Sequence, residues 1–275
     1  MIASISHVRK ILDERELKAK KKFGQNFLID GNVVDKIARN ATDSNETTIE
    51  IGPGIGSLTE CLLRYAKKVY AYEIDEDMYE ILNEEFKDED KLKVILEDFL
   101  KVDLDKVDYK DEKINVCSNL PYYVTTPILF KLFESDLNIS KITVMVQKEV
   151  ADRFKAQRGS EDYNALSIIV QYLYDVKQEM FVSKNVFYPS PKVDSAVISF
   201  TPKRERNYEF ERGFFDFVKK CFMKRRKTLS NNLKDFLDEE AIKKIYTNRQ
   251  LKATIRAQEL SLEDFLNIYG ELNER

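Results

Sequence analysis

The chain has 275 residues, a length that corresponds to about two domains, and its hydrophobic content of 43% excludes a disordered or low-complexity protein. The 45 Lys and Arg residues nearly cancel the 48 Asp and Glu residues, so the net charge of −3 argues against a uniformly basic coat for nucleic acid. One histidine (His7) and three widely spaced cysteines (Cys61, Cys117 and Cys221) are too few for a multi-histidine metal site or a disulfide framework, and we predict no metal.

The first 30 residues contain 7 basic and 4 acidic groups, a net charge of +3, and we interpret residues 1–30 as a basic N-terminal arm. The arm lacks the continuous apolar stretch of a signal peptide, and Asp13, Glu14 and Glu16 are atypical of a transit peptide. Apolar runs such as 142–146 are far shorter than the ~20 residues of a membrane span. We therefore expect a soluble, cytoplasmic protein with no membrane partner.

Short β-rich runs alternate with helical stretches between residues 47 and 147. Such alternation is typical of an α/β fold, in which helices cover both faces of a parallel sheet. The predicted strands are residues 47–51, 69–73, 92–97, 114–118 and 142–147. This part of the chain is strongly acidic, because residues 40–118 hold 10 basic and 21 acidic groups, a net charge of −11.

A glycine-rich loop at residues 50–56 has the sequence EIGPGIG and directly follows the first predicted strand. Glycines let the backbone turn tightly there and approach a ligand without a Cβ clash. The spacing is GxGxG rather than the GxGxxG of a dinucleotide fingerprint, and no Lys-Ser/Thr pair follows as in a P-loop. The loop therefore favours a nucleoside ligand that lacks a pyrophosphate.

Two acidic positions follow at the carboxyl ends of the next strands. Glu73 ends the second strand, 17 residues after Gly56, where a carboxylate can accept hydrogen bonds from both ribose hydroxyls. Glu97 and Asp98 end the third strand, where Asp98 can receive the exocyclic amine of an adenine. Either carboxylate alone is explained as an ordinary turn or surface residue. The set in this order indicates a nucleoside site, because open α/β sheets bind ligands at this edge.

The loop after the fourth strand, residues 118–123, has the sequence SNLPYY. The Asn119 side-chain carbonyl and the Leu120 backbone carbonyl can accept both N–H bonds of a nucleobase amine and direct its lone pair at an electrophile. Pro121 stiffens the loop, and Tyr122 offers a ring for base stacking, worth roughly 1–3 kcal/mol. If the electrophile is a sulfonium, no strong general base is required. Seen alone, the loop would be interpreted as a proline turn.

Residues 163–172 are predicted to be helical, and residues 193–200 alternate as a late strand after a break at residues 189–191. Beyond residue 202 the spacing is helical, without β-branched runs, at residues 208–223, 228–237, 239–246 and 261–271. We therefore predict a catalytic domain at residues 1–202 and a small all-helical domain at residues 203–275.

Basic residues gather in the second predicted domain, where residues 201–275 hold 17 basic and 13 acidic groups, a net charge of +4. The densest cluster, which we call the basic cluster, contains Lys219, Lys220, Lys224, Arg225, Arg226 and Lys227. On charge alone, a solvated helix face explains this cluster as well as a nucleic-acid surface does.

Taken together, the glycine loop, Glu73, Asp98 and residues 119–122 resemble the site of a class I S-adenosylmethionine-dependent methyltransferase that acts on an adenine amine. Three ordered segments resemble motifs of the KsgA-type small-subunit ribosomal RNA adenine dimethyltransferase family: KFGQNFL at residues 22–28, NLPYYVTTP at residues 119–127 and FYPSPKVDS at residues 187–195. The resemblance covers residues 20–235 and implies a Rossmann-like sheet with helices on both faces, followed by a helical C-terminal domain.

The resemblance implies S-adenosylmethionine as the cofactor. It implies that the N-terminal signature closes over the cofactor, that two glycines lie beneath its amino-acid part, and that two carboxylates take its ribose and its adenine. The two residues of the signature are Asn26 and Leu28, and the two glycines are Gly52 and Gly54. Glu73 would take the ribose, and Asp98 would take the adenine.

For the catalytic loop, the resemblance implies that Asn119 holds both the methyl-donor side and the target amine, beside Leu120 and Pro121. Tyr122 and Phe187 would sandwich the target base, in a slot that receives a base taken out of its stack. From the residues alone, Phe187 would be interpreted only as a core or loop aromatic.

The implied reaction transfers two methyl groups to each of two adjacent adenosines in a hairpin loop near the 3′ end of 16S rRNA, the small-subunit RNA. Bases in such single-stranded loops are open to aromatic stacking. The implied partner is 16S rRNA within the 30S subunit, and the basic cluster would bind the backbone of this RNA. We expect the enzyme to be monomeric.

Three alternative functions remain open. The nearest is a large-subunit rRNA adenine methyltransferase of the antibiotic-resistance type, whose loop typically reads NIPYN; Leu120, Tyr123 and Pro127 favour the small-subunit assignment. The second is a noncatalytic ribosome-assembly or transcription factor, which would have no use for a cofactor pocket. The third is a DNA adenine methyltransferase, whose target loop more usually begins with Asp and contains Pro-Pro.

Overall fold

The computed structural model describes residues 2–17, 19–20, 24–203 and 205–273. Within this described part, the chain forms two compact units: residues 1–151 with 177–202, and residues 152–176 with 203–275. Helix α6 (Lys148–Phe154) and strand β7 (Tyr174–Val182) contain points at which the chain passes from one unit to the other. None of the described helices is both long enough and apolar enough to cross a membrane.

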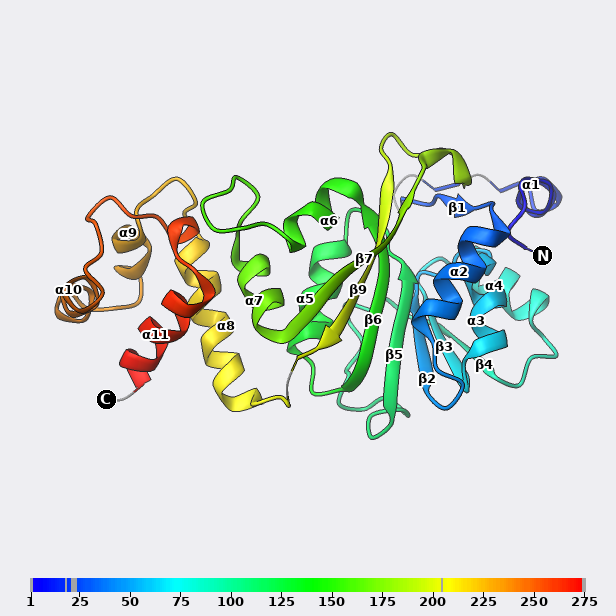
Figure 1. Ribbon diagram of the computed structural model, residues 1–275. Helices are drawn as coiled ribbons and strands as arrows, with labels where there is room; N and C mark the ends of the chain where they lie inside the picture. The colour runs from blue at the N-terminus through cyan, green and yellow to red at the C-terminus, as the bar shows by residue number, and fades with distance from the viewer. Residues whose placement is uncertain (1, 18, 21–23, 204, 274–275) are drawn as a thin grey trace. The chain divides into compact units, whose positions relative to one another are not determined.

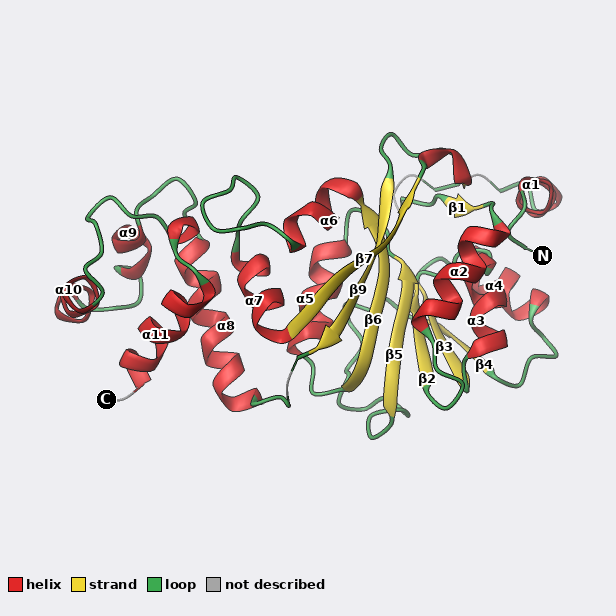
Figure 2. Ribbon diagram, viewed as in Figure 1, coloured by secondary structure: helices red, strands yellow, loops and turns green. Residues whose placement is uncertain are grey.

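The described residues form a seven-stranded sheet in the order β4-β3-β2-β5-β6-β9-β7 (Figures 1 and 2). The five strands β4, β3, β2, β5 and β6 run parallel to one another, whereas β9 is antiparallel to β6. The predicted α/β sheet and all five of its predicted early strands are confirmed. The strand bounds are Thr47–Ile51 (β2), Lys68–Glu73 (β3), Leu92–Leu96 (β4), Lys113–Asn119 (β5), Asn138–Gln147 (β6) and Ser195–Pro202 (β9).

Helices cover both faces of the sheet, as predicted. Helices α2 and α3 pack on one face, in front of the sheet in Figure 1. Helix α5 covers the opposite face, where Phe133 meets Phe200 of β9 with ring centroids 5.4 Å apart. The helix bounds are Ile5–Glu14 (α1), Gly31–Ala41 (α2), Ser57–Tyr65 (α3), Glu76–Glu85 (α4) and Thr125–Glu134 (α5).

Local sequence explains where these helices begin. The Asp30 carboxylate accepts hydrogen bonds from backbone N–H groups in the first turn of α2, and Asp75 does the same for α4. Helix α3 instead begins after Gly56, whose left-handed φ of +88° lets the glycine loop enter the helix directly. These caps place the starts of α3 and α4 next to the ends of β2 and β3, where the predicted site residues lie.

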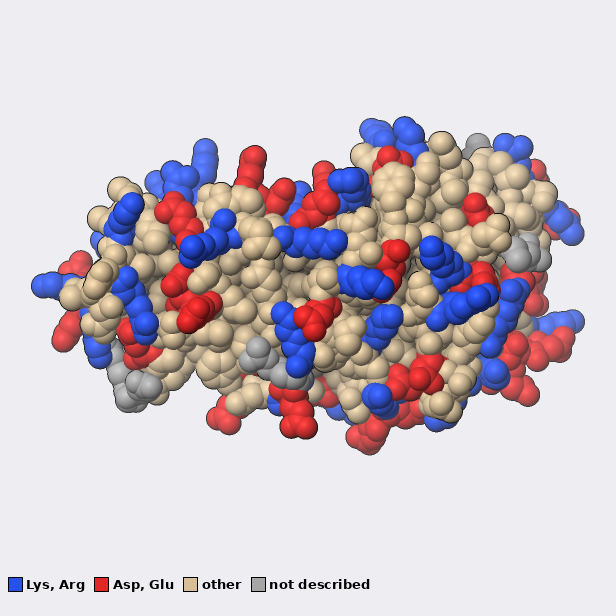
Figure 3. All heavy atoms as spheres, viewed as in Figure 1, with Lys and Arg blue, Asp and Glu red and all other residues tan. Residues whose placement is uncertain are grey.

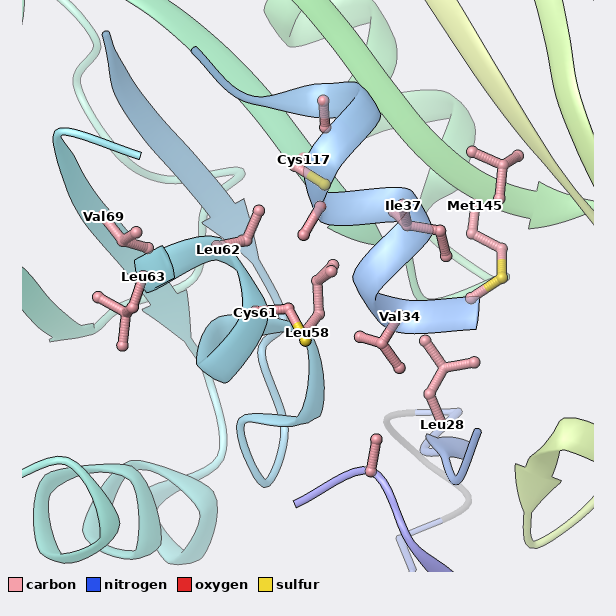
Figure 4. Packing of buried hydrophobic residues seen from close by; sticks show 14 of the residues in the cluster. Leu28, Val34, Ile37, Leu58, Cys61, Leu62, Leu63, Val69, Cys117 and Met145 are labelled. Atoms are coloured by element: carbon pink, nitrogen blue, oxygen red, sulfur yellow. The ribbon is translucent and has the colours of Figure 1, made fainter. Parts of the chain in front are cut away.

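Buried apolar side chains from α2, α3 and the strands beneath them form the core on that face (Figure 4). Each helix has one apolar side turned to the sheet, which is the arrangement that removes most apolar surface from water. The labelled members are Leu28, Val34, Ile37, Leu58, Cys61, Leu62, Leu63, Val69, Cys117 and Met145. The core therefore anchors the end of the glycine loop, since it contains Leu58 in the first turn of α3.

The second unit is mainly helical and has an aromatic core. Phe217 of α8 meets Phe265 of α11 with ring centroids 6.4 Å apart, and Phe214 meets Tyr269 at 5.6 Å. The buried Glu211 carboxylate pairs with Arg206, which compensates its removal from water. The bounds are Ala165–Leu173 (α7), Tyr208–Phe222 (α8), Leu229–Leu233 (α9), Glu239–Asn248 (α10) and Leu262–Asn273 (α11).

The division of the chain differs from the predicted domains of 1–202 and 203–275. The second unit does resume at residue 203, but it also contains residues 152–176. The reason is the packing of α7, whose Tyr172 ring lies 5.4 Å from that of Phe214 and 5.9 Å from that of Phe215, both on α8. Such contacts join segments far apart in sequence and leave no local signal at residue 152.

Several elements were not predicted, among them α1, α2 and strand β7. Two others are very short: β1 (Phe27–Leu28) and β8 (Phe187–Tyr188), which pair antiparallel with Leu28 opposite Phe187. The backbone N–H of Ile29 extends this pairing by donating to the carbonyl of Val186 at 2.9 Å. The pairing joins the N-terminal segment, residues 20–28, to the late loop, residues 187–195. Each contains one of the three motifs on which the family resemblance rests.

Gly56 provides a stability prediction. Gly56→Ala is expected to lower the free energy of unfolding by roughly 2–4 kcal/mol, the combined scale of a left-handed backbone and an overpacked methyl. A Cβ at this position would lie 2.5 Å from Cε2 of Phe86 and 3.1 Å from Cδ2 of Leu82. Urea unfolding of the variant measures the loss.

Gly159 supplies the matched control for this variant. Its φ is +83°, and no described atom lies within 4 Å of the position of an added Cβ. Gly159→Ala should therefore lower the free energy of unfolding only by the contribution of the left-handed backbone. Equal losses in both variants would mean that Phe86 and Leu82 move aside for the methyl.

Candidate active site

The carboxyl ends of β2, β3 and β5 meet at one edge of the sheet, beside a pocket of about 750 Å³, open mouth included. The walls come from four segments: the N-terminal segment, the glycine loop with the start of α3, the end of β3 and the loop after β5. The lining residues are 24–28, 50, 52–55, 57, 58, 73, 74 and 119–123.

The glycine loop forms a cradle whose close approaches require glycine. Gly52 and Gly54 have φ values of +69° and +61°. A Cβ at Gly54 would lie 3.2 Å from the Phe27 ring, and one at Gly52 would lie 3.5 Å from the Pro121 ring. The missing side chains therefore let both the N-terminal segment and the catalytic loop approach the glycine loop.

Glu73 connects this cradle to the end of β3. It is only 4% exposed, and its Oε2 accepts a hydrogen bond from the backbone N–H of Gly54 at 3.0 Å. Its Oε1 accepts bonds from the N–H groups of Ile74 and Asp75 at 2.8 and 2.9 Å. Burial raises the pKa of Glu73, although these three backbone bonds oppose the rise. The carboxylate is thus held rigidly where a ribose can donate to it.

Glu50 also lines the pocket, although the sequence pattern indicates no role for its side chain. It is 1% exposed, and it accepts a hydrogen bond from the Thr59 hydroxyl at 2.6 Å. Burial raises the pKa of Glu50 to about 8, and the nearby Glu73 adds to the rise. The sequence signal that could have drawn attention to Glu50 is its position near the end of β2, two residues before Gly52.

The catalytic loop begins at Asn119, the last residue of β5. The Asn119 Nδ2 donates to the backbone carbonyl of Asn26 at 3.3 Å, and the Leu120 N–H donates to the Met145 carbonyl at 3.2 Å. The bond to Asn26 uses the donor arm of the amide, and the acceptor arm, Oδ1, is the group able to receive an amino hydrogen. Asn119 therefore joins the N-terminal segment to the catalytic loop inside the pocket.

Tyr122 lies on the pocket wall with its ring half-buried. Its hydroxyl forms a hydrogen bond of 2.7 Å with the Ser195 hydroxyl. Burial raises the pKa of Tyr122, and the bond to Ser195 opposes the rise. The phenol therefore stays neutral at physiological pH, which suits an apolar stacking face.

The structure brings most of the predicted site residues into this one pocket: Asn26, Leu28, Gly52, Gly54, Glu73, Asn119, Leu120, Pro121 and Tyr122. Asp98 and Phe187 are not among the lining residues. The Asp98 Oδ1 accepts a hydrogen bond from its own turn, from the N–H of Leu100 at 3.0 Å. Lys22 and Phe23 of the N-terminal signature lie outside the described residues.

Phe187 is buried in the apolar core and is 3% exposed. The cause is the β1–β8 pairing, which sets Phe187 opposite the buried Leu28. The slot between Tyr122 and Phe187 that the resemblance implies is therefore not open in this arrangement, and Phe187 would have to leave the core to stack on a base.

Two residues of the N-terminal segment contact the start of α4. The Gln25 Nε2 donates to Asp75 Oδ2 at 2.7 Å, and the Lys20 Nζ pairs with both Asp75 and Asp77. These hydrogen bonds raise the pKa of Lys20. Together they fasten the segment beside Glu73, because the Asp75 N–H donates to Glu73.

The strand order with its antiparallel β9, the glycine cradle and the buried acidic residue at the end of β3 define a class I S-adenosylmethionine-dependent methyltransferase. The residues present fit the cofactor, since Gly52 and Gly54 line the pocket without side chains and the Glu73 carboxylate beside them offers oxygens that can accept from a ribose. The chain matches the family model for ribosomal RNA adenine dimethylase over residues 16–274. It belongs to the ribosomal RNA adenine dimethylase family.

Similar proteins agree with this assignment. The chain is 43% identical over 256 residues to a ribosomal RNA small subunit methyltransferase A of Mycoplasmopsis pulmonis, covering 93% of this chain and all of that protein. It is 43% identical over 285 residues to the protein of the same name in Leuconostoc mesenteroides, covering 100% of this chain and 97% of the relative. Among solved structures, a dimethyladenosine transferase from Plasmodium falciparum superposes with a TM-score of 0.70 at 28% identity, covering 90% of this chain and 97% of that one.

Proposed function

We propose that the protein dimethylates the exocyclic amines of two adjacent adenosines in the 3′-terminal hairpin loop of 16S rRNA, within the 30S subunit in the cytoplasm. The observation that carries this proposal is the meeting of Asn119 with Glu73 and the glycine cradle in one pocket. The small-subunit substrate is supported by the two relatives, both named ribosomal RNA small subunit methyltransferase A. We propose that the enzyme acts as a monomer.

The cofactor site supplies the first half of the mechanism. Gly52 and Gly54 would lie beneath the amino-acid part of S-adenosylmethionine, and Glu73 would accept the ribose hydroxyls. Asn26 and Leu28 would close over the cofactor, and Asp98 would receive its adenine amine. Bound there, S-adenosylmethionine supplies an electrophilic methyl group on its sulfonium.

The catalytic loop supplies the second half. An adenine amine is a poor nucleophile, because its lone pair is delocalised into the ring. The Asn119 Oδ1 and the Leu120 carbonyl would accept its two N–H bonds and direct that lone pair toward the methyl group. Pro121 restricts the loop to this geometry. The methylated amine is cationic and acidic enough to lose its proton to water, so no histidine is required.

The target base would stack on Tyr122. For the other side of the base, the proposal requires Phe187 to exchange its contacts in the apolar core for contacts with the base.

The basic cluster would bind the rRNA backbone. It lies on the last turn of α8 and on the turn that leads into α9. Several members have partners inside the unit: Lys220 pairs with Asp216 at 2.6 Å and Lys224 with Asp235 at 2.7 Å, and Arg225 donates to the Glu161 carbonyl. Figure 3 shows Lys and Arg side chains interspersed with Asp and Glu, which fits a net charge of −3.

Charge reversal at Arg226 and Lys227 tests this surface, because both side chains are exposed. The double change to glutamate should weaken 30S binding and reduce the slope of log K against log salt by about 1–2, since each lost phosphate contact removes about one released counterion. Filter binding over a salt series measures both quantities.

The matched control reverses Lys243 and Lys244, two exposed lysines of α10, so the net charge of the unit changes equally. This control should leave most of the salt dependence intact. If Arg226 and Lys227 can be reversed without changing 30S binding at any salt concentration, the basic cluster is a solvated helix face.

One experiment tests the proposed function as a whole. The protein is incubated with tritiated S-adenosylmethionine and, in parallel, with unmethylated 30S subunits, 50S subunits and duplex DNA. The expected result is label in the 30S RNA alone, in dimethyladenosine. Label in the 50S RNA or in the DNA would favour those alternative substrates, and no label anywhere would favour a noncatalytic factor.

A further inference from the structure

The late loop, residues 187–195, enters the proposed function only through Phe187 at its first position. Its last residue, Ser195, is the first residue of β9 and pairs in the sheet with Gln147 of β6. Ser195 is fully buried, with 0% exposure. A buried hydroxyl needs a hydrogen-bond partner, and the partner of this one is the Tyr122 hydroxyl at 2.7 Å.

The backbone beside Ser195 is held by two hydrogen bonds of the neighbouring Asp194, one to its carbonyl and one to its carboxylate. The Asp194 carbonyl accepts from the N–H of Lys148 at 3.0 Å, and the Asp194 carboxylate accepts from the N–H of Lys184 at 2.9 Å. The end of the late loop is thereby tied to the first turn of α6 and to the start of the segment before β8. Ser195 therefore offers a rigid point of attachment.

Tyr122 is restrained at its other end by its own backbone. The Pro121 carbonyl accepts from the Val124 N–H at 3.1 Å and from the Thr125 hydroxyl at 3.1 Å. These bonds fix the turn that carries Tyr122, but they leave the rotation of its side chain free. The bond from the phenol to Ser195 restrains that rotation, because it holds the far end of the ring.

We propose that Ser195 is a positioning residue that holds the Tyr122 ring as the platform on which the target adenine stacks. The inference rests on the proposed function, in which Tyr122 contacts the base. It assigns the end of the late loop to the base-binding side of the reaction, and it separates Ser195 from the cofactor side, where Glu73 and the glycine cradle act.

The test measures single-turnover methyl transfer to 30S subunits, cofactor affinity and thermal stability for three variants: Ser195→Ala, Tyr122→Phe and the double variant. Each single change removes one partner of the same hydrogen bond and keeps the Tyr122 ring. We expect the single-turnover rate constant to fall about tenfold in each, the scale at which one misplaced reactant contact lowers a rate. The double variant should fall no further, because the bond is already absent.

Two further variants separate positioning from structure and from stacking. Ser199→Ala, in the same strand, removes a similarly buried hydroxyl that donates to Glu179 at 2.7 Å, and it should keep parental transfer. Tyr122→Leu removes the ring itself and should lower transfer more than Tyr122→Phe does. Cofactor affinity should stay within about twofold of the parent in every variant, since the proposed cofactor contacts are made by Glu73 and the glycine cradle, which all the variants keep.

The outcomes are distinct. Parental transfer in both Ser195→Ala and Tyr122→Phe, with a loss in Tyr122→Leu, would overturn the positioning role and leave the proposed function standing. Multiplied losses in the double variant would also overturn it, because two independent roles would then be present. A parental protein that labels no 30S RNA would refute the proposed function and this inference with it.

Discussion

Asn119→Ala is expected to slow methyl transfer to the rRNA adenosines by about 10²-fold or more, the scale of a lost alignment of the reacting groups. The alanine removes Oδ1, which would accept one amino hydrogen and aim the nitrogen lone pair. Cofactor affinity should fall much less than transfer does, because Glu73 and the glycine cradle would still bind the cofactor when the contact from Asn119 is lost. Transfer of tritium to unmethylated 30S subunits and equilibrium binding of the cofactor measure the two quantities separately.

Asn115→Ala is the matched control for this variant. Asn115 lies on the same strand, β5, is also half of a side-chain hydrogen bond, to Glu46 at 2.9 Å, and is remote from the pocket lining. The Asn115→Ala protein should transfer methyl groups at the parental rate at any temperature where it is folded. An Asn119→Ala protein that dimethylated 30S particles at the parental rate would show that the catalytic loop has been assigned wrongly.

Glu50→Gln is expected to remove much of the pH dependence of folding in the cofactor-free protein. The folded pKa of Glu50, about 8, lies above its ordinary value of 4.5. The native state therefore holds a proton that the unfolded chain releases, and the parent loses stability as the pH rises from 4.5 through about 8. At 1.36 kcal/mol per pH unit, the loss has an upper limit of about 5 kcal/mol. Glutamine does not titrate and can still accept the Thr59 hydroxyl bond.

Urea unfolding at pH 5.5, 7.0 and 8.5 measures this effect. The free energy of unfolding of the variant, relative to that of the parent, should increase as the pH rises. Glu80→Gln, on the exposed side of α4, removes the same charge from the surface and should track the parent at each pH. Parallel curves for Glu50→Gln and the parent would mean that the Glu50 carboxylate is stabilised in its charged form.

Much of the first unit could be predicted from sequence because its signals are local. The five early strands are continuous β-rich runs, and the glycine loop and the carboxyl ends of these strands are close in sequence to the residues that they position. Parallel topology then brings Glu73 and Asn119 to the same edge without further information. The pocket contains nine of the predicted cofactor and catalytic residues for this reason.

What could not be predicted depends on contacts between distant segments. The assignment of α7 to the second unit follows from Tyr172 meeting the rings of α8, and no pattern near residue 172 indicates it. The burial of Phe187 follows from its pairing with Leu28, almost 160 residues earlier. The raised pKa of Glu50 follows from its surroundings in the fold, since the same residue at an exposed strand end would titrate normally.

The pairing of β1 with β8 has a consequence for the timing of catalysis. Phe27 and Leu28 belong to the segment that borders the cofactor pocket, and their partners Tyr188 and Phe187 begin the late loop. A movement that uncovers the pocket must either break this two-stranded ribbon or carry the late loop with it. Under the proposed function, exchange of the used cofactor and occupation of the base slot would therefore be linked through this ribbon, and each successive transfer would begin only after both sides of the site had returned to their starting arrangement.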